Sequence, residues 1–502
     1  MQIQRILPLL FLLLFLGMAS AALSYDLNLL EDNAEVNMQI ELISTKAANV
    51  FQGSMQIPEN AKITRIKDSS GNISEFSLEK GDLTFKTNYS IAKEKEIVDI
   101  KMIWPNIIDK NYYGLNCSKL SFSGIKDIET TVNIEGNKIL SFEASAGFNT
   151  YYSENKITVK GIGPVNIYLC YSDKGLYFKH YVLFGETINL SETEDYFDII
   201  PLVLGIMPAF SRFPIVIMED AHYNIEINEY SQGTHMPGGV LIIKKSLFED
   251  KQGKTNEGII TTIHETVHSF NALALGWNNT QASFFDEGIA KLIESIALER
   301  AEAYDAKLFY GEVKYAEGNK LFTLLPKGEV EDLLDYYLNN RTFMVEWNPS
   351  NVNNRAFGYA YGELYAKKYV MDYGITKLQK AYREFVEINE SITSEGKAYD
   401  KINVVLGATE QPCYTKSLQE LKDCLNTVNA YHIMVPNQTQ VLIVGQQELK
   451  GTKETSITEI KDMQKQKIID IYYELKKRFN SLFEKIMLAW KSQIKNVAEG
   501  DV

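Results

Sequence analysis

The sequence predicts an α+β protein with a β-rich N-terminal part and a mainly helical C-terminal part. Hydrophobic residues alternate with polar ones in short runs over about residues 25–185, and from about residue 255 they recur with the period of a helix. The 502 residues allow about three domains. We therefore expect one or two β-sandwich-like domains over residues 22–185, a central α+β domain over residues 186–372 and a helical region over residues 373–502.

Composition and charge narrow the class of protein. With 45% hydrophobic and 23% charged residues, the chain is ordinary for a globular protein, which excludes collagen-like and largely disordered structures. The 51 Lys and Arg residues against 65 Asp and Glu residues give a formal net charge of −14. Because affinity for nucleic acid comes mainly from basic residues that neutralise phosphates, we expect no nucleic-acid partner.

The first 21 residues have the pattern of a signal peptide. Arg5 precedes an apolar run over residues 6–18, and the small-x-small pattern ASA follows and ends at Ala21. The run is short for a transmembrane helix, which needs about 20 residues. An uncleaved N-terminal anchor is the alternative, because the next two residues, Ala and Leu, extend the apolar stretch. In both cases we expect an extracytoplasmic protein, secreted or tethered to the outer face of the membrane through this segment.

Four cysteines follow the signal pattern, and an even number in an exported protein is typical of disulfides. Of the three possible pairings we expect Cys117–Cys170 with Cys413–Cys424, because these close the shortest loops. The absence of a CxxC pattern argues against a cysteine zinc site or a redox motif. Eight Asn-x-Ser/Thr sequons are compatible with a glycoprotein: Asn72, Asn88, Asn116, Asn189, Asn278, Asn340, Asn389 and Asn437.

The β-rich part contains runs such as VNMQIELI, FQGSMQIP and EIVDIKMIW. Turn-forming residues at 69–72 and 135–137 separate such runs, and short strands spaced in this way are typical of a β-sandwich. Two further strand-like runs belong to the central domain, PIVIME at 214–219 and GGVLIIKKSLF at 238–248.

Helical periodicity marks the later part of the chain. Its first apolar face is formed by residues at helical spacing: Ile259, Ile260, Ile263, Val267 and Phe270. Ser283 and Asp286 have capping-box spacing ahead of a second apolar helix. Further helices are expected near 356–372, 376–388 and 453–495. The last of these is amphipathic with mixed charge, which favours packing against the central domain or a partner over membrane binding.

The chemically informative residues are concentrated between 264 and 287. His264-Glu265-x-x-His268 is an HExxH motif, and residues i and i+4 of a helix share a face, so both imidazoles reach one ion. Zinc suits imidazole and carboxylate ligands in tetrahedral geometry, and a catalytic site keeps one position open. Glu265 lies about 100° around the helix from His264, where it can act as a general base instead of a ligand. The chain has six histidines in total, so the motif rarely arises by chance.

Glu287 is the candidate for the third metal ligand. It lies near the start of the next predicted helix, in the sequence ASFFDEGIAKLIES, 19 positions after His268. A helix–loop–helix turn can fold this first turn back over the HExxH face. Asp286, beside it, is placed either to orient a metal-bound histidine or to act as a plain helix cap.

This motif carries a family resemblance. HETVH, followed after 18 residues by the glutamate of FFDEGIA, resembles the gluzincin zinc metallopeptidases of peptidase clan MA, specifically the aminopeptidase N and leukotriene hydrolase group. The resemblance covers about residues 210–370 and implies a thermolysin-like catalytic domain. That group places a tyrosine on a later helix, in a Tyr-x-x-Gly pattern, to hydrogen-bond the oxyanion of the tetrahedral intermediate. The pattern occurs here as Tyr359-Ala-Tyr-Gly362, which implies a catalytic role for Tyr359, with Tyr361 as the alternative.

The chain departs from this group at the segment that binds the substrate backbone. Aminopeptidases of the group carry Gly-x-Met-Glu-Asn before the zinc helix, and its glutamate binds the free α-amine. The corresponding stretch here is GTHMPGG at 233–239, which has no glutamate, and Glu219 lies before the loop. His235, Gly238 and Gly239 are therefore the candidate substrate-binding residues. The resemblance supports a metallopeptidase more strongly than an aminopeptidase.

We expect an exported zinc metallopeptidase that binds one Zn²⁺ per chain and hydrolyses a peptide or protein substrate. In this mechanism Glu265 takes a proton from a zinc-activated water, which attacks the peptide carbonyl while Tyr359 stabilises the oxyanion. An aminopeptidase-type exopeptidase is one alternative. A catalytically silent binding module on a peptidase scaffold and a zinc hydrolase with a non-peptide substrate are the others. The oligomeric state stays open.

Overall fold

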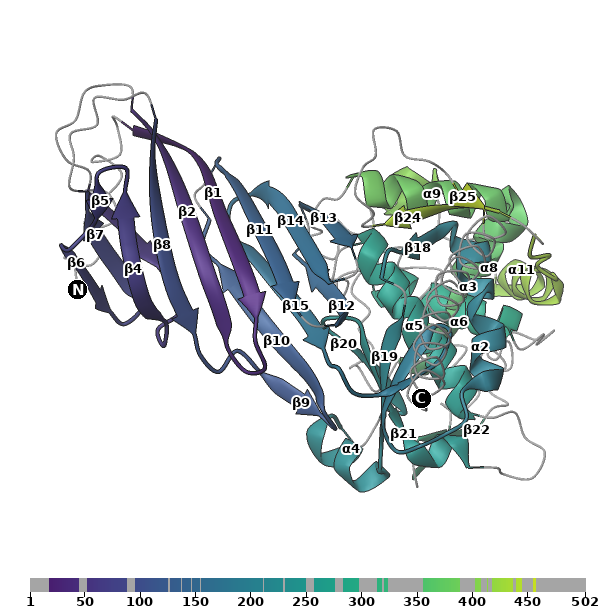
Figure 1. Ribbon diagram of the computed structural model, residues 1–502. Coiled ribbons are helices and arrows are strands. Elements are labelled where there is room, and N and C mark those ends of the chain that lie inside the picture. Colours follow the sequence, from purple (N-terminus) through teal and green to yellow (C-terminus); the bar gives the residue numbers. More distant parts are fainter. Residues whose placement is uncertain are drawn as a thin grey trace, which may run out of the picture.

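The computed structural model describes residues 18–44, 52–87, 95–249, 257–275, 283–297, 314–323, 355–388, 402–444 and 455–456, with short gaps inside these ranges. The fold mixes strands and helices in several sheets. The N-terminal strands form a long β-rich body, and the helices gather around a smaller sheet at one end of it (Figure 1). Among the described residues, no helix has both the length and the hydrophobicity needed to cross a membrane.

An eight-stranded sheet is the largest part of the β-rich body, with strand order β13-β14-β11-β1-β2-β8-β4-β5. Its strands are β1 (Met18–Leu29), β2 (Ala34–Ser44), β4 (Lys62–Asp68), β5 (Gly71–Asn72), β8 (Lys95–Trp104), β11 (Glu129–Gly136), β13 (Phe148–Ser153) and β14 (Lys156–Ile162). The predicted runs VNMQIELI and EIVDIKMIW lie in β2 and β8, which pair antiparallel. Alternate side chains such as Leu23, Tyr25 and Leu27 are buried, as the period of a strand requires.

The first strand bears on the predicted signal peptide. β1 begins at Met18, which pairs with Ser44 of β2. Cleavage after Ala21 would therefore remove the first residues of this strand. Residues 1–17, with nearly all of the apolar run, lie outside the described residues. The signal peptide and its cleavage stay a prediction.

A four-stranded sheet of order β12-β15-β10-β9 packs against the large sheet. It consists of β9 (Lys110–Tyr112), β10 (Leu115–Phe122), β12 (Ile139–Ala144) and β15 (Val165–Tyr171). The rings of Tyr25 on β1 and Phe122 on β10 lie 5.1 Å apart in the core between the sheets. Cys117 and Cys170 are directly opposed on β10 and β15 and form the predicted disulfide. The arrangement is a sandwich of two sheets, as the alternating pattern predicts.

A smaller sheet of order β3-β7-β6 completes the β-rich body. Its strands are β3 (Gln52–Gln56), β6 (Phe76–Glu79) and β7 (Asp82–Lys86). The predicted run FQGSMQIP supplies β3.

The predicted central domain contains most of a five-stranded sheet of order β16-β17-β19-β21-β20, whose strands β16 and β17 lie before the expected boundary at residue 186. Its strands are β16 (Leu176–Tyr177), β17 (Tyr181–Gly185), β19 (Phe213–Met218), β20 (Gly233–Met236) and β21 (Val240–Lys244). β17, β19 and β21 are parallel, whereas β20 is an antiparallel edge strand. Ile215 and Ile217 face the main core, and Val216 and Met218 face a second cluster shared with β10 and β15. Burial on both faces explains why these strands read as continuous apolar runs.

Helices cover this sheet and build most of the rest of the domain. They are α2 (Ser191–Phe197), α3 (Ile199–Leu204), α4 (Asp220–Glu226), the short 3₁₀ helix η2 (Lys245–Phe248), α5 (Glu257–Leu275), α6 (Ser283–Ala297), α8 (Arg355–Tyr373), α9 (Ile375–Ile388) and α11 (Leu418–Ala430). The helices expected near 356–372 and 376–388 are α8 and α9. The second strand-like run of the central domain ends as η2 instead of continuing as a strand.

The C-terminal part contains strands that the helical periodicity did not predict. β24 (Gln440–Val444) pairs in parallel with β18 (Ile206–Pro208) and antiparallel with β25 (Thr455–Ser456). A helix over 453–495 is therefore wrong at Thr455–Ser456, and the rest of that range lies outside the described residues. The pairing joins Ile206 to Leu442, a contact between distant segments that no local pattern reveals. The second predicted disulfide, Cys413–Cys424, also lies in this part.

A separate hairpin lies earlier in the chain, where β22 (Lys314–Glu317) pairs antiparallel with β23 (Lys320–Thr323).

Candidate metal centre

Helix α5 carries the HExxH motif and is buried along nearly its whole length. A helix that is apolar on most sides lies inside a domain, and α5 packs on the five-stranded sheet. The rings of Phe270 on α5 and Phe213 on β19 stack with centroids 5.9 Å apart. The hydroxyl groups of Tyr181 on β17 and Thr266 on α5 also form a buried hydrogen bond of 3.2 Å. The sheet thereby fixes the rotation of α5 about its axis.

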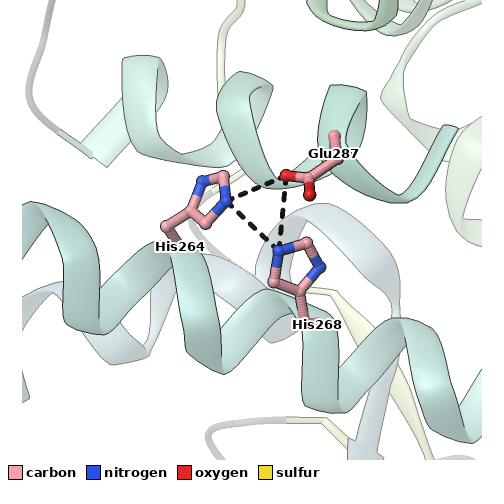
Figure 2. A group of neighbouring side chains, drawn as sticks. All are labelled: His264, His268 and Glu287. Carbon is pink, nitrogen blue, oxygen red and sulfur yellow. Dashed lines mark hydrogen bonds and ion pairs between the residues drawn. The ribbon is translucent and has the colours of Figure 1, made fainter. Parts of the chain in front are cut away.

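Two histidines of α5 and one glutamate of α6 bring their donor atoms to one point (Figure 2). His264 Nε2 lies 3.1 Å from Glu287 Oε2 and 3.2 Å from His268 Nε2, and the third separation, His268 Nε2 to Glu287 Oε2, is 3.5 Å. Ligand atoms about 2.0–2.1 Å from a tetrahedral zinc ion are about 3.3 Å from one another. The three donors therefore have the chemistry and the spacing of a three-residue zinc site.

The charges of this group are strongly coupled. Burial alone would lower the pKa of His268, but Asp286 and Glu287 raise it well above its usual value. Burial alone would raise the pKa of Glu287, but the two histidines lower it far below its usual range. Glu287 is thus held as a carboxylate that faces two imidazoles, which is the charge state of a metal ligand.

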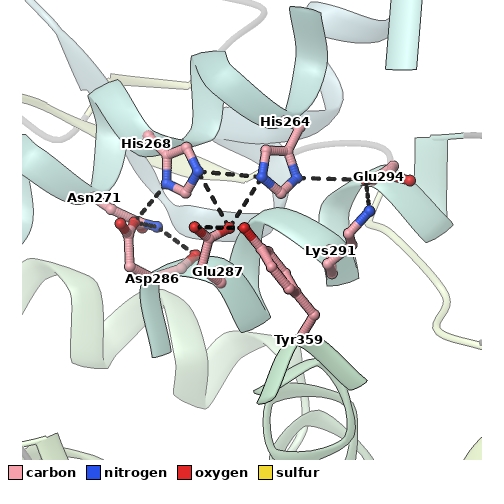
Figure 3. Close-up of polar contacts among 8 residues, drawn as sticks. All are labelled: His264, His268, Asn271, Asp286, Glu287, Lys291, Glu294 and Tyr359. Atoms are coloured by element: carbon pink, nitrogen blue, oxygen red, sulfur yellow. Dashed lines mark hydrogen bonds and ion pairs between the residues drawn. The ribbon is translucent and has the colours of Figure 1, made fainter. Parts of the chain in front are cut away.

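Each histidine has a carboxylate on its other ring nitrogen (Figure 3). His268 Nδ1 lies 2.9 Å from Asp286 Oδ1, so Asp286 is placed to orient this ligand, as one reading of the sequence expects. His264 Nδ1 lies 3.4 Å from Glu294 Oε2, and Lys291 Nζ lies 2.9 Å from the same oxygen. A proton on each Nδ1 leaves both Nε2 atoms free to bind a metal.

Glu294 and Lys291 were missed by the sequence reasoning. Glu294 follows Glu287 by seven residues on α6, which is two helical turns, so both project from the same face. That spacing is the signal that could have identified Glu294. Burial alone would raise the pKa of Glu294, but Lys291 and His264 hold it at about 2. Glu294 is therefore an anion fixed behind His264.

Glu265 directly follows His264 on α5, the helix that also carries His268. It is 7% exposed, and burial raises the pKa of its carboxyl above the usual value, against the opposing effect of the two histidines. The backbone of Gly233, at the start of edge strand β20, approaches this carboxylate so closely that an added Cβ there would lie 3.1 Å from Glu265 Oε1. The carboxyl group of Glu265 thus lies against the start of the edge strand β20.

Tyr359 reaches the same point from α8. Its hydroxyl donates a hydrogen bond of 3.2 Å to Glu287 Oε1 (Figure 3). α8 comes this close because two glycines meet where it crosses α6: an added Cβ at Gly288 would overlap the backbone of Gly362. The alternative residue, Tyr361, is also on α8, but its side chain is outside the described part.

The predicted substrate-binding residues lie at the edge of the five-stranded sheet. His235 is on β20, and Gly238 and Gly239 form the turn to β21 with positive φ values of 94° and 77°. The structure adds a partner that no sequence pattern indicates, Glu143 on β12. Its Oε1 lies 3.0 Å from His235 Nε2, and its Oε2 accepts a hydrogen bond of 3.1 Å from the Gly238 N–H. A buried carboxylate from the β-rich body therefore lies against this turn.

Glu219, the other carboxylate considered for this role, is engaged elsewhere. It precedes α4 and pairs with Lys245, whose Nζ also contacts Glu186. These side chains are partly exposed. Glu219 is therefore part of a surface ion-pair group.

Comparison with known proteins finds likeness at the level of three-dimensional structure. No protein-family model and no curated protein matches the chain. A mutant of an M1 zinc metallopeptidase from Deinococcus radiodurans aligns with 84% of this chain and 97% of its own, with 10% identity and a TM-score of 0.35. A second structure from that organism, a mutant bound to a Tyr-Ser-Ala substrate, aligns with 84% of this chain and 96% of its own, with 9% identity and a TM-score of 0.35. At this TM-score the likeness is coarse, so the function proposed below depends on the side chains of this chain.

Proposed function

We propose that this chain is a zinc-dependent peptidase whose metal is held by His264, His268 and Glu287. The observation that carries the proposal is the convergence of these three donors beside two further groups suited to hydrolysis, Glu265 and Tyr359. When bound, zinc acts as a Lewis acid toward a carbonyl oxygen and lowers the pKa of water.

The residues of the chain supply the remaining steps. Glu265 accepts a proton from the attacking water and returns it to the leaving amine, and its burial-raised pKa makes it a better base than an exposed glutamate. Tyr359 donates its hydroxyl proton in a hydrogen bond to the oxygen that gains negative charge. Asp286 and Glu294 hold the two imidazoles in the tautomer that presents Nε2 to the metal.

The test is Glu265→Gln, with zinc content and cleavage of a peptide library measured by mass spectrometry. We expect the variant to retain one zinc per chain and to lose hydrolysis by at least about a hundredfold, because the base is removed and the ligands are kept. Glu257→Gln is the matched control, since it makes the same change at the start of the same helix. Cleavage by Glu265→Gln at the wild-type rate would overturn the mechanism. Zinc without cleavage in the wild type would favour a silent binding module or a non-peptide substrate.

A second candidate, trimming of peptides from their N-terminus, is favoured by Glu143. This carboxylate is 8% exposed and lies against the turn that contains Gly238 and Gly239, where a substrate strand beside β20 would end. A buried carboxylate pairs readily with a cation, which here would be the α-ammonium group of a peptide.

Free and N-acetylated forms of the same peptides distinguish the two activities. If the protein trims peptides from the N-terminus, acetylation should abolish cleavage by the wild type. Glu143→Gln should then no longer prefer the free peptide over the acetylated one. Glu96→Gln is the matched control, because Glu96 is a buried glutamate of the same β-rich body that accepts hydrogen bonds from Ser69. Equal cleavage of both peptide forms would assign internal cleavage instead.

We also propose that the protein acts outside the cytoplasm. The two disulfides, Cys117–Cys170 and Cys413–Cys424, are consistent with an oxidising compartment. Localisation of a tagged full-length chain in its native cell tests this proposal, and retention in the cytoplasm with reduced thiols would contradict it.

A further inference from the structure

A line of buried hydrogen bonds runs from His268 away from the metal centre to helix α9. Asp286 Oδ1, which lies 2.9 Å from His268 Nδ1, also accepts a hydrogen bond of 2.7 Å from Asn271 Nδ2. Asn271 Oδ1 in turn accepts a hydrogen bond of 2.6 Å from the hydroxyl of Tyr382. Asn271 and Tyr382 are both 0% exposed, so bulk water does not compete for these bonds.

The hydroxyl of Tyr382 and the two acceptors of Asp286 favour the same orientation of the Asn271 amide. The amide nitrogen donates to Asp286 twice, to the carboxylate and, at 3.2 Å, to the backbone carbonyl. An amide turned by 180° would direct its oxygen at these acceptors and its NH₂ group at the tyrosine. Burial and the charge of Asp286 raise the pKa of Tyr382 well above its usual value, so the hydroxyl stays a donor.

The ring of Tyr382 is itself held in place by aromatic packing. It stacks on Phe285 with centroids 6.2 Å apart and meets Phe385 edge-on at 6.0 Å. Phe285 precedes Asp286 in α6, so the same contacts fix α9 against the turn that carries the carboxylate. The hydroxyl therefore has a defined position relative to Asp286.

We propose that Tyr382 and Asn271 are positioning residues for the zinc ligand His268, acting through Asp286. The proposal rests on the zinc-binding function proposed above. Without the Tyr382 hydroxyl, the Asn271 oxygen has no buried donor from α9, and the amide is held only by its own two bonds to Asp286. The Asn271 amide and the Asp286 carboxylate are then less firmly placed, and so is the imidazole that Asp286 orients.

The test measures zinc affinity by competition with a chelator in the full-length chain. We expect Tyr382→Phe to weaken zinc binding about three- to tenfold, less than the roughly 10- to 100-fold typical for loss of a residue that contacts the ligand itself. Tyr365→Phe is the matched control: the buried Tyr365 also donates its hydroxyl to an asparagine oxygen, Asn403 Oδ1, at 2.7 Å, but neither residue belongs to the line of hydrogen bonds between His268 and α9. Its zinc affinity should equal that of the wild type.

A double-mutant cycle with Asp286→Asn separates positioning from a general loss of stability. If Tyr382 acts through Asp286, Tyr382→Phe has no further effect on zinc affinity once Asp286→Asn is present. Asn271→Ala provides a second entry to the same cycle, should Tyr382→Phe fail to fold.

The outcomes distinguish this proposal from the function on which it rests. A wild-type chain without zinc would reject the proposed function. A zinc-binding wild type in which Tyr382→Phe matches Tyr365→Phe would reject the positioning role and leave the zinc site intact. Equal effects of Tyr382→Phe with and without Asp286→Asn would also reject it, because the tyrosine would then act by another route.

Discussion

The contact between α6 and α8 should set the activity of the site through Tyr359. Replacing Gly362 by alanine adds a Cβ that would lie 2.9 Å from the Cα of Gly288 and closer still to the carbonyl oxygen of Phe284. A carbon atom in close contact with a carbonyl oxygen is about 3.3–3.6 Å away, whereas the added Cβ would lie 2.2 Å from the Phe284 oxygen, so α8 must move away from α6 by roughly 1 Å or more. The Tyr359 hydroxyl, now 3.2 Å from Glu287 Oε1, would then lie beyond hydrogen-bond distance.

This displacement has a calculable effect on catalysis. Removing one donor to the oxyanion typically lowers kcat about 10²- to 10³-fold, and we expect this loss for Tyr359→Phe. Gly362→Ala keeps the hydroxyl but moves it, so its kcat should fall by about 10²-fold while zinc stays bound. The assay is single-substrate peptide hydrolysis at saturating zinc, with zinc content measured on the same samples. Gly258→Ala is the control, because its added Cβ meets the side chain of Phe248 instead of a helix backbone.

The combination of the two variants makes the reasoning refutable. If Gly362→Ala acts by moving Tyr359, it has little additional effect in a chain that already carries Tyr359→Phe. Full activity of Gly362→Ala would show that the glycine contact does not position the tyrosine. A full additional loss in the double variant would show that the displacement acts through another group.

Three other properties follow from the structure. Glu294→Gln should weaken zinc binding about 10- to 100-fold, because it weakens the support of His264; chelator competition measures this. Burial raises the pKa of Glu363 to about 7, from 4.5, so stability falls as pH rises through this interval, by up to roughly 3 kcal/mol. The Tm of wild type should therefore fall relative to the Tm of Glu363→Gln when the pH is raised from 5 to 8. Replacing Cys117 and Cys170 by alanine should destabilise the chain by about 4 kcal/mol, as a 53-residue loop is released; an unchanged Tm would contradict this.

The parts of the site that sequence reasoning reached are local. His264 and His268 share a helical face by their spacing, and Glu287 lies near the start of the next amphipathic helix, where a helix–loop–helix turn can bring it to that face. Tyr359 is predicted in another way, from the resemblance of its Tyr-x-x-Gly pattern to a family motif. The structure gives a reason for the glycine of this pattern, because Gly362 is the residue of α8 that lies against α6. Site residues that are close in sequence can thus be predicted from their spacing before the fold is known.

The parts that escaped depend on contacts between distant segments. Glu143 belongs to β12, and its carboxylate meets Gly238 across 95 residues of sequence. Asn271 and Tyr382 are 111 residues apart, and each reads in sequence as an ordinary helix residue. β24 pairs with β18 in the same long-range way. Such contacts follow from how sheets and helices pack, which the hydrophobic period of one segment does not encode.

Charge at the centre gives a final reason to expect a metal. Four carboxyl groups lie around two imidazoles, three of them buried (Glu265, Asp286 and Glu294) and one partly buried (Glu287), and Lys291 contributes a cation at one side. Buried anions destabilise a fold unless cations oppose them, and a divalent ion offsets this excess. Zinc at a thousand times its dissociation constant adds about 4 kcal/mol to stability. Chelation should therefore lower Tm measurably, and zinc should restore it. A Tm that does not change with zinc would contradict this reasoning. It would mean that protons on the two histidines already balance the carboxylates, so that the arrangement of the three donors does not depend on a metal.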